Sequence, residues 1–183
     1  MAKTQVQGNF SFRLMALEYR LRDARQPPLR ILQEIGVKQC MAVLDFGCGP
    51  ASFSVAAAKV VGSAGRVYAV DIHPLAIRSV KRAALRENIG NIRLVLGNDV
   101  PGVSEGSIDM VLVFDVLHHL SDPGPFLARF QELLASNGVL SVRDHRLNQA
   151  ELLAAITTSG RFQLLGQNRW VFQFRKIRTN EVL

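Results

Sequence analysis

The sequence predicts an α/β protein with a doubly wound, mostly parallel, seven-stranded sheet, an antiparallel last strand and helices at the N-terminus. Three observations support this fold class. Short apolar runs alternate with helical segments over most of the 183 residues, as in sheets whose parallel strands are joined by helices. The run Met110–Phe114 is continuously apolar, which is typical of a strand buried on both faces. Two strand-like segments close to the C-terminus predict a hairpin, which supplies an antiparallel strand.

Five predicted strands precede the hairpin, and helices separate most of them. We expect the strands at Ala42–Asp45, Val67–Val70, Asn91–Leu96, Met110–Phe114 and Val139–Val142, and the hairpin strands at Phe162–Leu165 and Trp170–Phe174. We expect the helices of this part at Phe53–Val61, Leu75–Glu87, Gly124–Ala135 and Gln149–Thr158. Asn137-Gly138 is expected to turn the chain into the fifth strand. A dinucleotide dehydrogenase sheet lacks such a hairpin at its end.

Two helices are predicted before the first strand. Apolar residues at helical spacing among arginines indicate an amphipathic helix over Phe10–Arg25, and Pro27-Pro28 ends it, because proline disfavours helix in the residue before it. A second helix is expected over Leu29–Ile35, closed by Gly36. These helices either form a lid over a ligand site or only cover the edge of the sheet. We therefore divide the single domain into a helical lid or substrate segment, residues 1–40, and a sheet-bearing part, residues 41–183.

The motif VLDFGCGPAS, residues 43–52, lies between the first strand and the first helix of the sheet. Gly47 and Gly49 are separated by one residue, and Ala51 follows at the same spacing. Glycine tolerates positive φ and lets a ligand approach the backbone closely. The start of the next helix presents unpaired N–H groups and the positive end of the helix dipole. This pattern predicts a ligand-binding turn, and the alternative is a plain turn in which small residues serve packing.

Two acids accompany this turn. Asp45 precedes the first glycine, where a carboxylate would be a poor neighbour for a dinucleotide pyrophosphate and would suit a positively charged ligand, such as the ammonium of an amino acid. Asp71 ends the second strand, 24 residues after Gly47, and an acid near this distance accepts hydrogen bonds from ribose hydroxyls. The alternative for Asp71 is a carboxylate that only holds a turn or a helix start.

These motifs together resemble those of class I S-adenosylmethionine-dependent methyltransferases. The similar features are the pattern D-x-G-C-G-x-A at residues 45–51, the strand that ends in Asp71, and the segment FDVLHH at residues 114–119. The resemblance covers about residues 30–176 and implies a Rossmann-like methyltransferase fold with S-adenosylmethionine as the cofactor. The sequence departs from the family pattern at Ala51, where a third glycine is usual and alanine occurs at times.

The resemblance also implies which residues bind the cofactor. An acid usually lies in the turn after the third strand of this family, where a side-chain oxygen of Asn98 or Asp99 could accept from the adenine amino group, and the sequence does not choose between them. The residues expected to bind the cofactor are Asp45, Gly47, Cys48, Gly49, Asp71, Ile72, Asn98, Asp99 and Asp115.

All four histidines fall at predicted carboxyl ends of strands, the edge where open parallel sheets bind ligands. An acceptor with a proton needs a base, and histidine suits this role near neutral pH. We therefore predict acceptor-side catalytic residues among His118, His119, Asp144 and His145. Asp144 and His145 could orient one another only through a turn, and His119 could instead be a packed helix residue. A zinc-like site of His118, His119 and His145 is the alternative, although we expect no metal.

Charge and cysteine content indicate which partners and which compartment to expect. Of the net charge of +7, residues 1–40 and 161–183 carry +4 each and residues 41–160 carry −1. A basic end can bind nucleic acid, an anionic substrate or a membrane surface, or can simply be solvated. Cys40 and Cys48 are expected to be free thiols in a reducing compartment. Because the start lacks an apolar signal segment and no run of roughly 18 apolar residues occurs, we expect a cytoplasmic protein without a membrane span.

The expected function is transfer of a methyl group from S-adenosylmethionine to a small-molecule acceptor. Two alternatives stay open: a nucleic-acid (RNA) methyltransferase that uses the basic termini, and a non-catalytic S-adenosylmethionine-binding protein. Against the first, FDVLHH replaces the N/D-P-P-Y/F segment of base-amine methyltransferases, and neither cysteine belongs to a motif for C5 methylation. The sequence does not choose between O, N, S and C acceptors, nor does it determine the oligomeric state.

Overall fold

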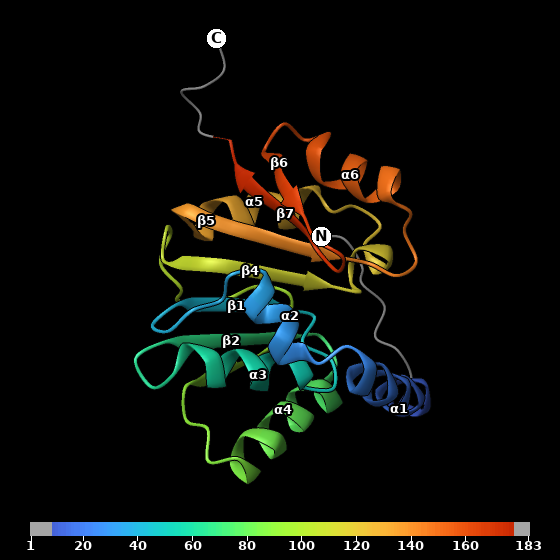
Figure 1. Cartoon of the computed structure of the whole chain (residues 1–183), viewed down its shortest axis with the longest axis vertical. Coiled ribbons are helices and arrows are strands. Elements are labelled where there is room, and N and C mark those ends of the chain that lie inside the picture. Colours follow the sequence, from blue (N-terminus) through green and yellow to red (C-terminus); the bar gives the residue numbers. More distant parts are fainter. Residues whose placement is uncertain (1–8, 178–183) are drawn as a thin grey trace. The chain divides into compact units, whose positions relative to one another are not determined.

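The computed structural model describes residues 9–177, which form six α-helices, one 3₁₀ helix and seven strands (Figure 1). The strands follow the order β3-β2-β1-β4-β5-β7-β6 in one sheet. The predicted fold class, a mostly parallel doubly wound sheet with an antiparallel last strand, is thereby confirmed. The chain divides at Pro101 and Gly102 into two compact units, which we describe separately.

The N-terminal unit contains three parallel strands and four helices. Strand β1 lies between β2 and the rest of the strand order, and β2 pairs with β3 in parallel. Helices α3 and α4 pack on these strands, and α2 packs on α3. The elements are α1 (Asn9–Arg25), α2 (Pro28–Glu34), β1 (Ala42–Phe46), α3 (Ser52–Val61), β2 (Arg66–Asp71), α4 (Pro74–Arg86) and β3 (Ile92–Leu96).

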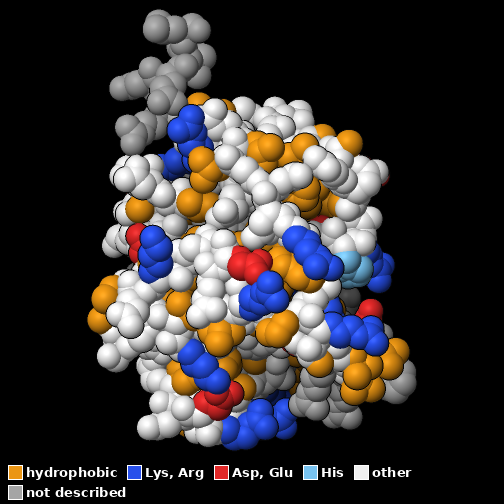
Figure 2. Space-filling view, viewed as in Figure 1, with side chains coloured by type: hydrophobic (Ala, Val, Ile, Leu, Met, Phe, Trp, Pro, Cys, Tyr) orange, Lys and Arg blue, Asp and Glu red, His pale blue; other side chains and the backbone are white. Residues whose placement is uncertain are grey.

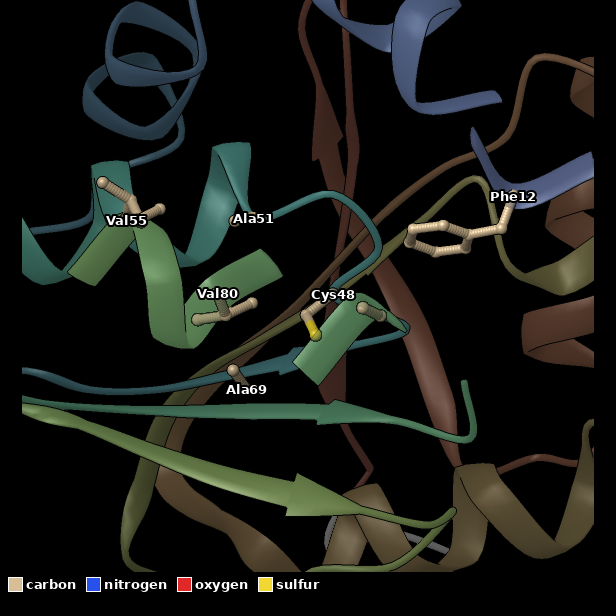
Figure 3. Packing of buried hydrophobic residues seen from close by; sticks show 8 residues of the cluster. Phe12, Cys48, Ala51, Val55, Ala69 and Val80 are labelled. Atoms are coloured by element: carbon tan, nitrogen blue, oxygen red, sulfur yellow. The ribbon is translucent and has the colours of Figure 1, made fainter. Parts of the chain in front are cut away.

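Small apolar side chains form the core between the helices and strands of this unit (Figure 3). Ala69 of β2 and Ala76 of α4 are fully buried, as is Val80 one turn further along α4. Their small size lets α3 and α4 pack closely on the strands. Phe12 of α1 joins the same cluster with only 4% of its surface exposed. Helix α1 is thus anchored to the unit by an aromatic side chain.

The C-terminal unit carries the other four strands. Strands β4 and β5 pair in parallel, whereas β7 pairs antiparallel with both β5 and β6. The hairpin predicted near the C-terminus is therefore confirmed. The elements are β4 (Ile108–Phe114), η1 (Leu117–His119), α5 (Gly124–Leu133), β5 (Leu134–Arg143), α6 (Gln149–Thr157), β6 (Phe162–Gln167) and β7 (Phe172–Lys176).

The start of β5 differs from the prediction. Helix α5 ends at Leu133 rather than Ala135, and β5 begins at Leu134, so Asn137-Gly138 lies within the strand and not in a turn before it. Leu134 pairs with Ile108, but the register shifts before the next pair, so β5 bulges between them. A Cβ atom on Gly138 would lie 2.9 Å from the Ile108 carbonyl oxygen. The glycine therefore serves a close backbone approach, which the sequence alone does not reveal.

Two further expectations can be compared with the described residues. Cys40 is exposed and Cys48 is buried, and both are free thiols, as predicted. Within residues 9–177, each helix is too short or too polar to cross a lipid bilayer.

Gly65, in the loop before β2, gives a test of this packing. A Cβ there would lie 2.5 Å from the Val61 Cβ and 2.7 Å from the Met41 carbonyl oxygen. We expect Gly65→Ala to lower the free energy of unfolding by about 2–3 kcal/mol, because the backbone must move to relieve this overlap. Urea denaturation would measure the change. Gly90→Ala is the matched control, because nothing lies within 4 Å of its added Cβ, and equal stability of the two variants would contradict the packing described.

Candidate functional site

The turn after β1 has an unusual backbone conformation. Gly47 and Gly49 have φ values of 76° and 50°, and Ala51 has a φ of 94°. The glycines are needed for this shape, as the sequence predicts. An alanine at such a φ costs roughly 1–2 kcal/mol, and burial of its methyl group in the core cluster returns about 0.8 kcal/mol. Packing of the methyl group therefore offsets only part of the conformational cost of having alanine rather than glycine at residue 51.

The Asp71 carboxylate holds this turn against the end of β2. Its Oδ2 accepts a hydrogen bond from the Gly49 N–H at 3.0 Å, and its Oδ1 accepts from the His73 N–H at 2.7 Å. Burial raises the pKa of Asp71, although these backbone donors oppose the rise. The turn-holding role considered from the sequence is therefore present. A carboxylate has further lone pairs, so the predicted contact with a ribose stays a prediction.

Asp45 is buried behind the same turn, with 3% of its surface exposed. Ser54 Oγ of α3 donates a hydrogen bond to Asp45 Oδ2 at 2.5 Å. Burial raises the pKa of Asp45 to about 7; the Ser54 hydrogen bond opposes this rise and the negative charge of Asp71 adds to it. The sequence analysis did not identify Ser54, whose only sequence signal is its place in the first turn of the helix behind the motif.

The remaining residues expected near a cofactor have varied surroundings. The N–H groups of Gly47 and Cys48 both donate to the Val70 carbonyl, at 2.8 and 3.0 Å, so they serve the turn itself. Burial, and then the charges of Asp45 and Asp71, raise the pKa of the Cys48 thiol well above its usual range. Cys48 is therefore a neutral, inert thiol. Beyond this turn, Ile72 is half-buried, Asn98 and Asp99 are exposed, and Asp99 Oδ1 accepts from the Val100 N–H at 2.7 Å.

Helix α1 lies against this turn. The Phe12 ring stacks on the His73 ring, with 4.6 Å between the centroids. A Cβ atom on Gly49 would lie 4.0 Å from Cε2 of Tyr19. His73 is itself buried, and its Nδ1 accepts the Leu75 N–H at 3.1 Å, capping α4. His73 thus has a structural role, and the contacts of α1 are compatible with either a lid or a cover.

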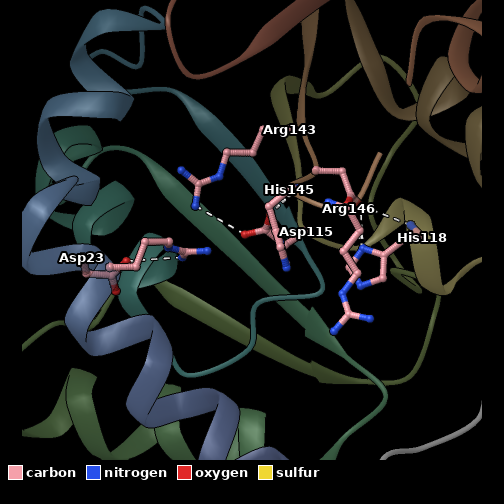
Figure 4. A network of polar contacts seen from close by, with 8 residues as sticks. Asp23, Asp115, His118, Arg143, His145 and Arg146 are labelled. Atoms are coloured by element: carbon pink, nitrogen blue, oxygen red, sulfur yellow. Dashed lines mark hydrogen bonds and ion pairs between the residues drawn. The ribbon is translucent and has the colours of Figure 1, made fainter. Parts of the chain in front are cut away.

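In the C-terminal unit, His118 and Asp144 form a close pair (Figure 4). The His118 Nδ1 lies 2.8 Å from each carboxylate oxygen of Asp144, and the His118 N–H donates to Asp144 Oδ2 at 3.1 Å. The Arg146 N–H donates to Asp144 Oδ1 at 3.0 Å. Because an ionised carboxylate only accepts hydrogen bonds, Nδ1 must carry the proton. In the neutral ring, Nε2 is then left with its lone pair.

A second pair joins Asp115, after β4, to His145, after β5. Asp115 Oδ1 lies 3.0 Å from the His145 Nδ1 and accepts from the His145 N–H at 3.2 Å. Arg143 Nη2 lies 3.4 Å from Asp115 Oδ2. Asp115, which we expected to bind the cofactor, thus contacts His145 and Arg143. Asp144 and His145, which we considered as mutual partners, instead bind to residues from the end of β4.

His119 lies beside these two pairs, and part of the cluster could hold a metal ion. The His119 ring is exposed and lies 3.9 Å from the His118 ring. Partial burial, and then the neighbouring His118, lower the pKa of His119. Among the described residues, the group that could hold a metal ion is Asp115, Asp144 and His145, with ligand atoms within 4.8 Å of one another. This set differs from the three histidines considered from the sequence, and a cation there would have to displace the hydrogen bonds and the ion pair just described.

Comparison with known proteins identifies the family. The chain is 35% identical over 97 residues to aklanonic acid methyltransferase of Streptomyces sp. (strain C5), covering 52% of this chain and 44% of that protein. It is 37% identical over 106 residues to ribosomal protein L11 methyltransferase of Aliivibrio fischeri, covering 55% and 34%. The chain thus spans less than half the length of either relative.

Two further comparisons concern the fold and the whole domain. A crystal structure of a SAM-dependent methyltransferase from Aquifex aeolicus superimposes with a TM-score of 0.67 at 21% identity, covering 82% of this chain and 88% of that one, and at this identity it shows the fold alone. The model of a family described as "Methyltransferase domain" matches residues 38–179. Because this match covers most of the chain, the chain belongs to the methyltransferase-domain family.

Proposed function

We propose that this chain transfers the methyl group of S-adenosylmethionine to a small-molecule acceptor that carries a dissociable proton, with His118 as the general base. The observation that carries the proposal is the contact of His118 Nδ1 with both oxygens of the fully buried Asp144 side chain. The bound cofactor supplies an electrophilic methyl group on a sulfonium. The residues of the chain bind and orient the reactants and remove the proton of the acceptor.

The turn after β1 has groups that suit this cofactor. S-adenosylmethionine carries an ammonium, a carboxylate, a sulfonium and a ribose. The carboxylates of Asp45 and Asp71 attract positively charged groups, and Asp71 keeps lone pairs that can accept from hydroxyl donors. The N-terminus of α3 suits a carboxylate. We therefore propose the turn at 45–51 and Asp71 as the cofactor site, with Ile72, Asn98 and Asp99 toward the adenine.

The base role is argued from the tautomer of His118. Asp144 fixes the proton on Nδ1, so Nε2 is the nitrogen that can accept a proton from an acceptor hydroxyl, amine or thiol. The buried Asp144 carboxylate then stabilises the imidazolium that forms, as in other histidine–carboxylate pairs. General-base catalysis of this kind contributes about 10²–10⁴-fold. We assign His119, His145 and Asp115 to the surroundings of this base.

The relatives leave the acceptor class open. By its name, one relative methylates aklanonic acid, a small molecule, whereas another methylates a ribosomal protein. We favour a small molecule over nucleic acid because FDVLHH, residues 114–119, replaces the N/D-P-P-Y/F segment of base-amine methyltransferases. A macromolecular acceptor, including RNA drawn by the basic ends of the chain, is the alternative outcome of the assay below.

The raised pKa of Asp45 predicts that the stability of the fold depends on pH. Its pKa is about 7 in the folded protein against the ordinary 3.8, so the folded state keeps a proton that the unfolded chain loses. The resulting stabilisation is complete below about pH 4 and is lost as the pH rises through 7, amounting to roughly 4 kcal/mol. Relative to wild type, Asp45→Asn should therefore gain stability as the pH rises, since Ser54 can still donate to the amide oxygen.

Denaturation at pH values from about 4 to 8, without ligand, measures this difference. Glu105→Gln, at an exposed loop position, is the matched control and should follow wild type throughout. A constant difference between Asp45→Asn and wild type over this range would show that burial does not hold the proton on Asp45.

The proposed role of Asp71 predicts that its substitution weakens cofactor binding. An amide at this position offers one accepting oxygen instead of two and has no charge, so Asp71→Asn should weaken S-adenosylmethionine binding at least about tenfold, by loosening the Gly49 contact and weakening the ribose contact. Titration calorimetry with S-adenosylmethionine, S-adenosylhomocysteine and NAD measures it. Wild type should bind the first two and not NAD. Unchanged affinity in Asp71→Asn would remove Asp71 from the cofactor site.

The proposed base is tested by transfer of a labelled methyl group to a panel of phenols, amines and thiols, with total RNA as a further acceptor. His118→Asn should lower kcat at least about 100-fold and leave S-adenosylmethionine affinity unchanged. Asp144→Asn should lower kcat as well, because its amide can donate to Nδ1 and favour the wrong tautomer. His145→Asn is the control and should lose less than about fivefold, because this half-exposed ring lies outside the proposed proton path.

The outcomes of this assay separate the alternatives. Full activity of His118→Asn would refute the base assignment while leaving the cofactor site intact. Methylation of RNA alone would replace the small-molecule acceptor with a macromolecular one. Tight cofactor binding without turnover on any acceptor would identify a non-catalytic S-adenosylmethionine-binding protein.

A further inference from the structure

The charged side chains in the loops after β4 and β5 differ in their exposure. The carboxylates of Asp115 and Asp144 are buried, with 3% and 0% of their side chains exposed, whereas His119, His145 and Arg146 are exposed. Figure 2 shows histidine surface on the outside of the molecule. A molecule that approaches this cluster therefore meets imidazole rings and a guanidinium before it meets a carboxylate.

The two exposed acids of these loops each hold the start of a helix. The Gly124 N–H donates to Asp122 Oδ1 at 2.9 Å, where α5 begins, and the Asn148 N–H donates to Glu151 Oε2 at 2.9 Å, in the capping box of α6. The two buried acids are bound within the cluster, as described above. Each acid of the loops thus has a partner of its own, and among the described residues none of them forms an ion pair with the Arg146 guanidinium.

Arg146 lies beside the proposed base. Its N–H donates to Asp144 Oδ1 at 3.0 Å, which fixes its backbone next to the pair of His118 and Asp144. Burial, then His118 and then the charge of Arg146 lower the pKa of His119, and the His119 ring is 3.9 Å from the His118 ring. Figure 4 shows the Arg146 side chain extending along the His118 ring. Within the described part of the chain, a cation that has no bound anion is therefore close to the base.

The charge and shape of a guanidinium indicate which anion it would bind. Its parallel N–H donors match the oxygens of a carboxylate or a phosphate. A phosphate monoester carries a charge of about −1.5 to −2 at neutral pH, which calls for more than one cation. His119 does not supply a second positive charge near neutral pH, because its pKa is lowered. A carboxylate, with a single negative charge, is balanced by Arg146 alone.

We propose that Arg146 selects acceptors that carry a carboxylate, by binding this group through its guanidinium while the dissociable proton of the acceptor faces Nε2 of His118. The inference rests on the proposed function, because it takes the acceptor to enter beside His118. A bound carboxylate holds the reacting atom in place beside the base, and such positioning lowers the barrier to reaction. A neutral acceptor lacks this contact and binds more weakly.

Titration calorimetry of the full chain, saturated with S-adenosylhomocysteine, measures this preference. 3-Hydroxybenzoate and 3-hydroxybenzamide present the same hydroxyl and differ in the charge of the second group, and their 2- and 4-isomers cover other spacings. For at least one isomer, wild type should bind the acid at least about fivefold more tightly than the amide, a modest factor because the guanidinium is exposed. 3-Hydroxyphenyl phosphate, which carries more charge, should bind no more tightly than the acid.

Arg146→Gln should abolish the preference through a loss of affinity for the acid alone, because glutamine keeps the backbone N–H that binds Asp144. Arg146→Lys should keep part of the preference, because the charge stays while the parallel N–H donors are lost. With methyl transfer as the readout, Arg146→Gln should raise KM for the acid at least about fivefold and change kcat less than about twofold. A purely structural role of Arg146 would instead lower kcat for acid and amide alike.

Arg161→Gln is the matched control, because it removes an exposed arginine at the other end of the strands. The Arg161 carbonyl accepts from the Ile177 N–H, just after the end of β7. The start of β7, in contrast, pairs with the end of β5, which leads into Arg146. Arg161→Gln should therefore keep the wild-type preference for the acid.

The outcomes separate this inference from the proposed function. Equal binding of acid and amide by wild type, a preference that survives in Arg146→Gln, or tighter binding of the phosphate would overturn the selection of carboxylates. His118→Asn should lose methyl transfer and keep the binding preference, because it leaves Arg146 in place. Binding of the acid through Arg146 without methyl transfer by wild type would refute the proposed function and leave the carboxylate site established.

Discussion

The hydrogen bond from the Gly49 N–H to the Asp71 carboxylate joins two segments that are 22 residues apart in the chain. The turn it holds has positive φ at Gly47, Gly49 and Ala51, a conformation that glycine adopts readily and alanine only at a cost. The Gly47 and Cys48 N–H groups are likewise bound to the end of β2, at the Val70 carbonyl. The shape of the turn therefore depends on β2. Because α3 starts at the end of this turn, the position of Ser54 under Asp45 depends on it too.

The two acids beside the turn would suit a positively charged ligand group, as we propose for this site. Asp45 is buried, and this burial raises its pKa to about 7, so its protonated form persists much closer to neutral pH than in an exposed aspartate. Asp71 is close enough for its negative charge to contribute to that rise. A positively charged ligand group near these carboxylates would favour their ionised forms and replace the proton. The same burial that disfavours the free carboxylate thus strengthens its interaction with a cation, because the local dielectric is low.

The parts of the fold that the sequence predicted follow from local physical rules. Buried parallel strands have apolar runs, as in Met110–Phe114, and a turn with positive φ needs glycine, as at Gly47 and Gly49. The early start of β5 was not predicted, because the contact of Gly138 with the Ile108 carbonyl depends on tertiary packing. The partner of Asp45 was missed for the same reason, since a serine in a helix carries no signal of what it faces.

For the catalytic candidates, too, the sequence predicted the positions of the residues but not their contacts. The sequence placed His118, His119, Asp144 and His145 at strand ends, and the structure brings them into one cluster within the C-terminal unit. The sequence could not predict which residues pair, because His118 and Asp144 are 26 residues apart and Asp115 and His145 are 30 residues apart. Neighbours in sequence suggested Asp144 with His145, whereas strand ends place each acid beside the histidine of the adjacent strand.

The two histidine–aspartate pairs are not equivalent as bases. Asp115 also forms an ion pair with Arg143, and that cation already compensates part of its charge, so less remains to stabilise a proton on His145. The described donors to Asp144 are His118 itself and the Arg146 backbone N–H, which are neutral groups while the histidine is neutral. The His145 side chain is 51% exposed, against 10% for His118, so water screens its interaction more strongly. These differences in partners and exposure support our choice of His118, rather than His145, as the proposed base.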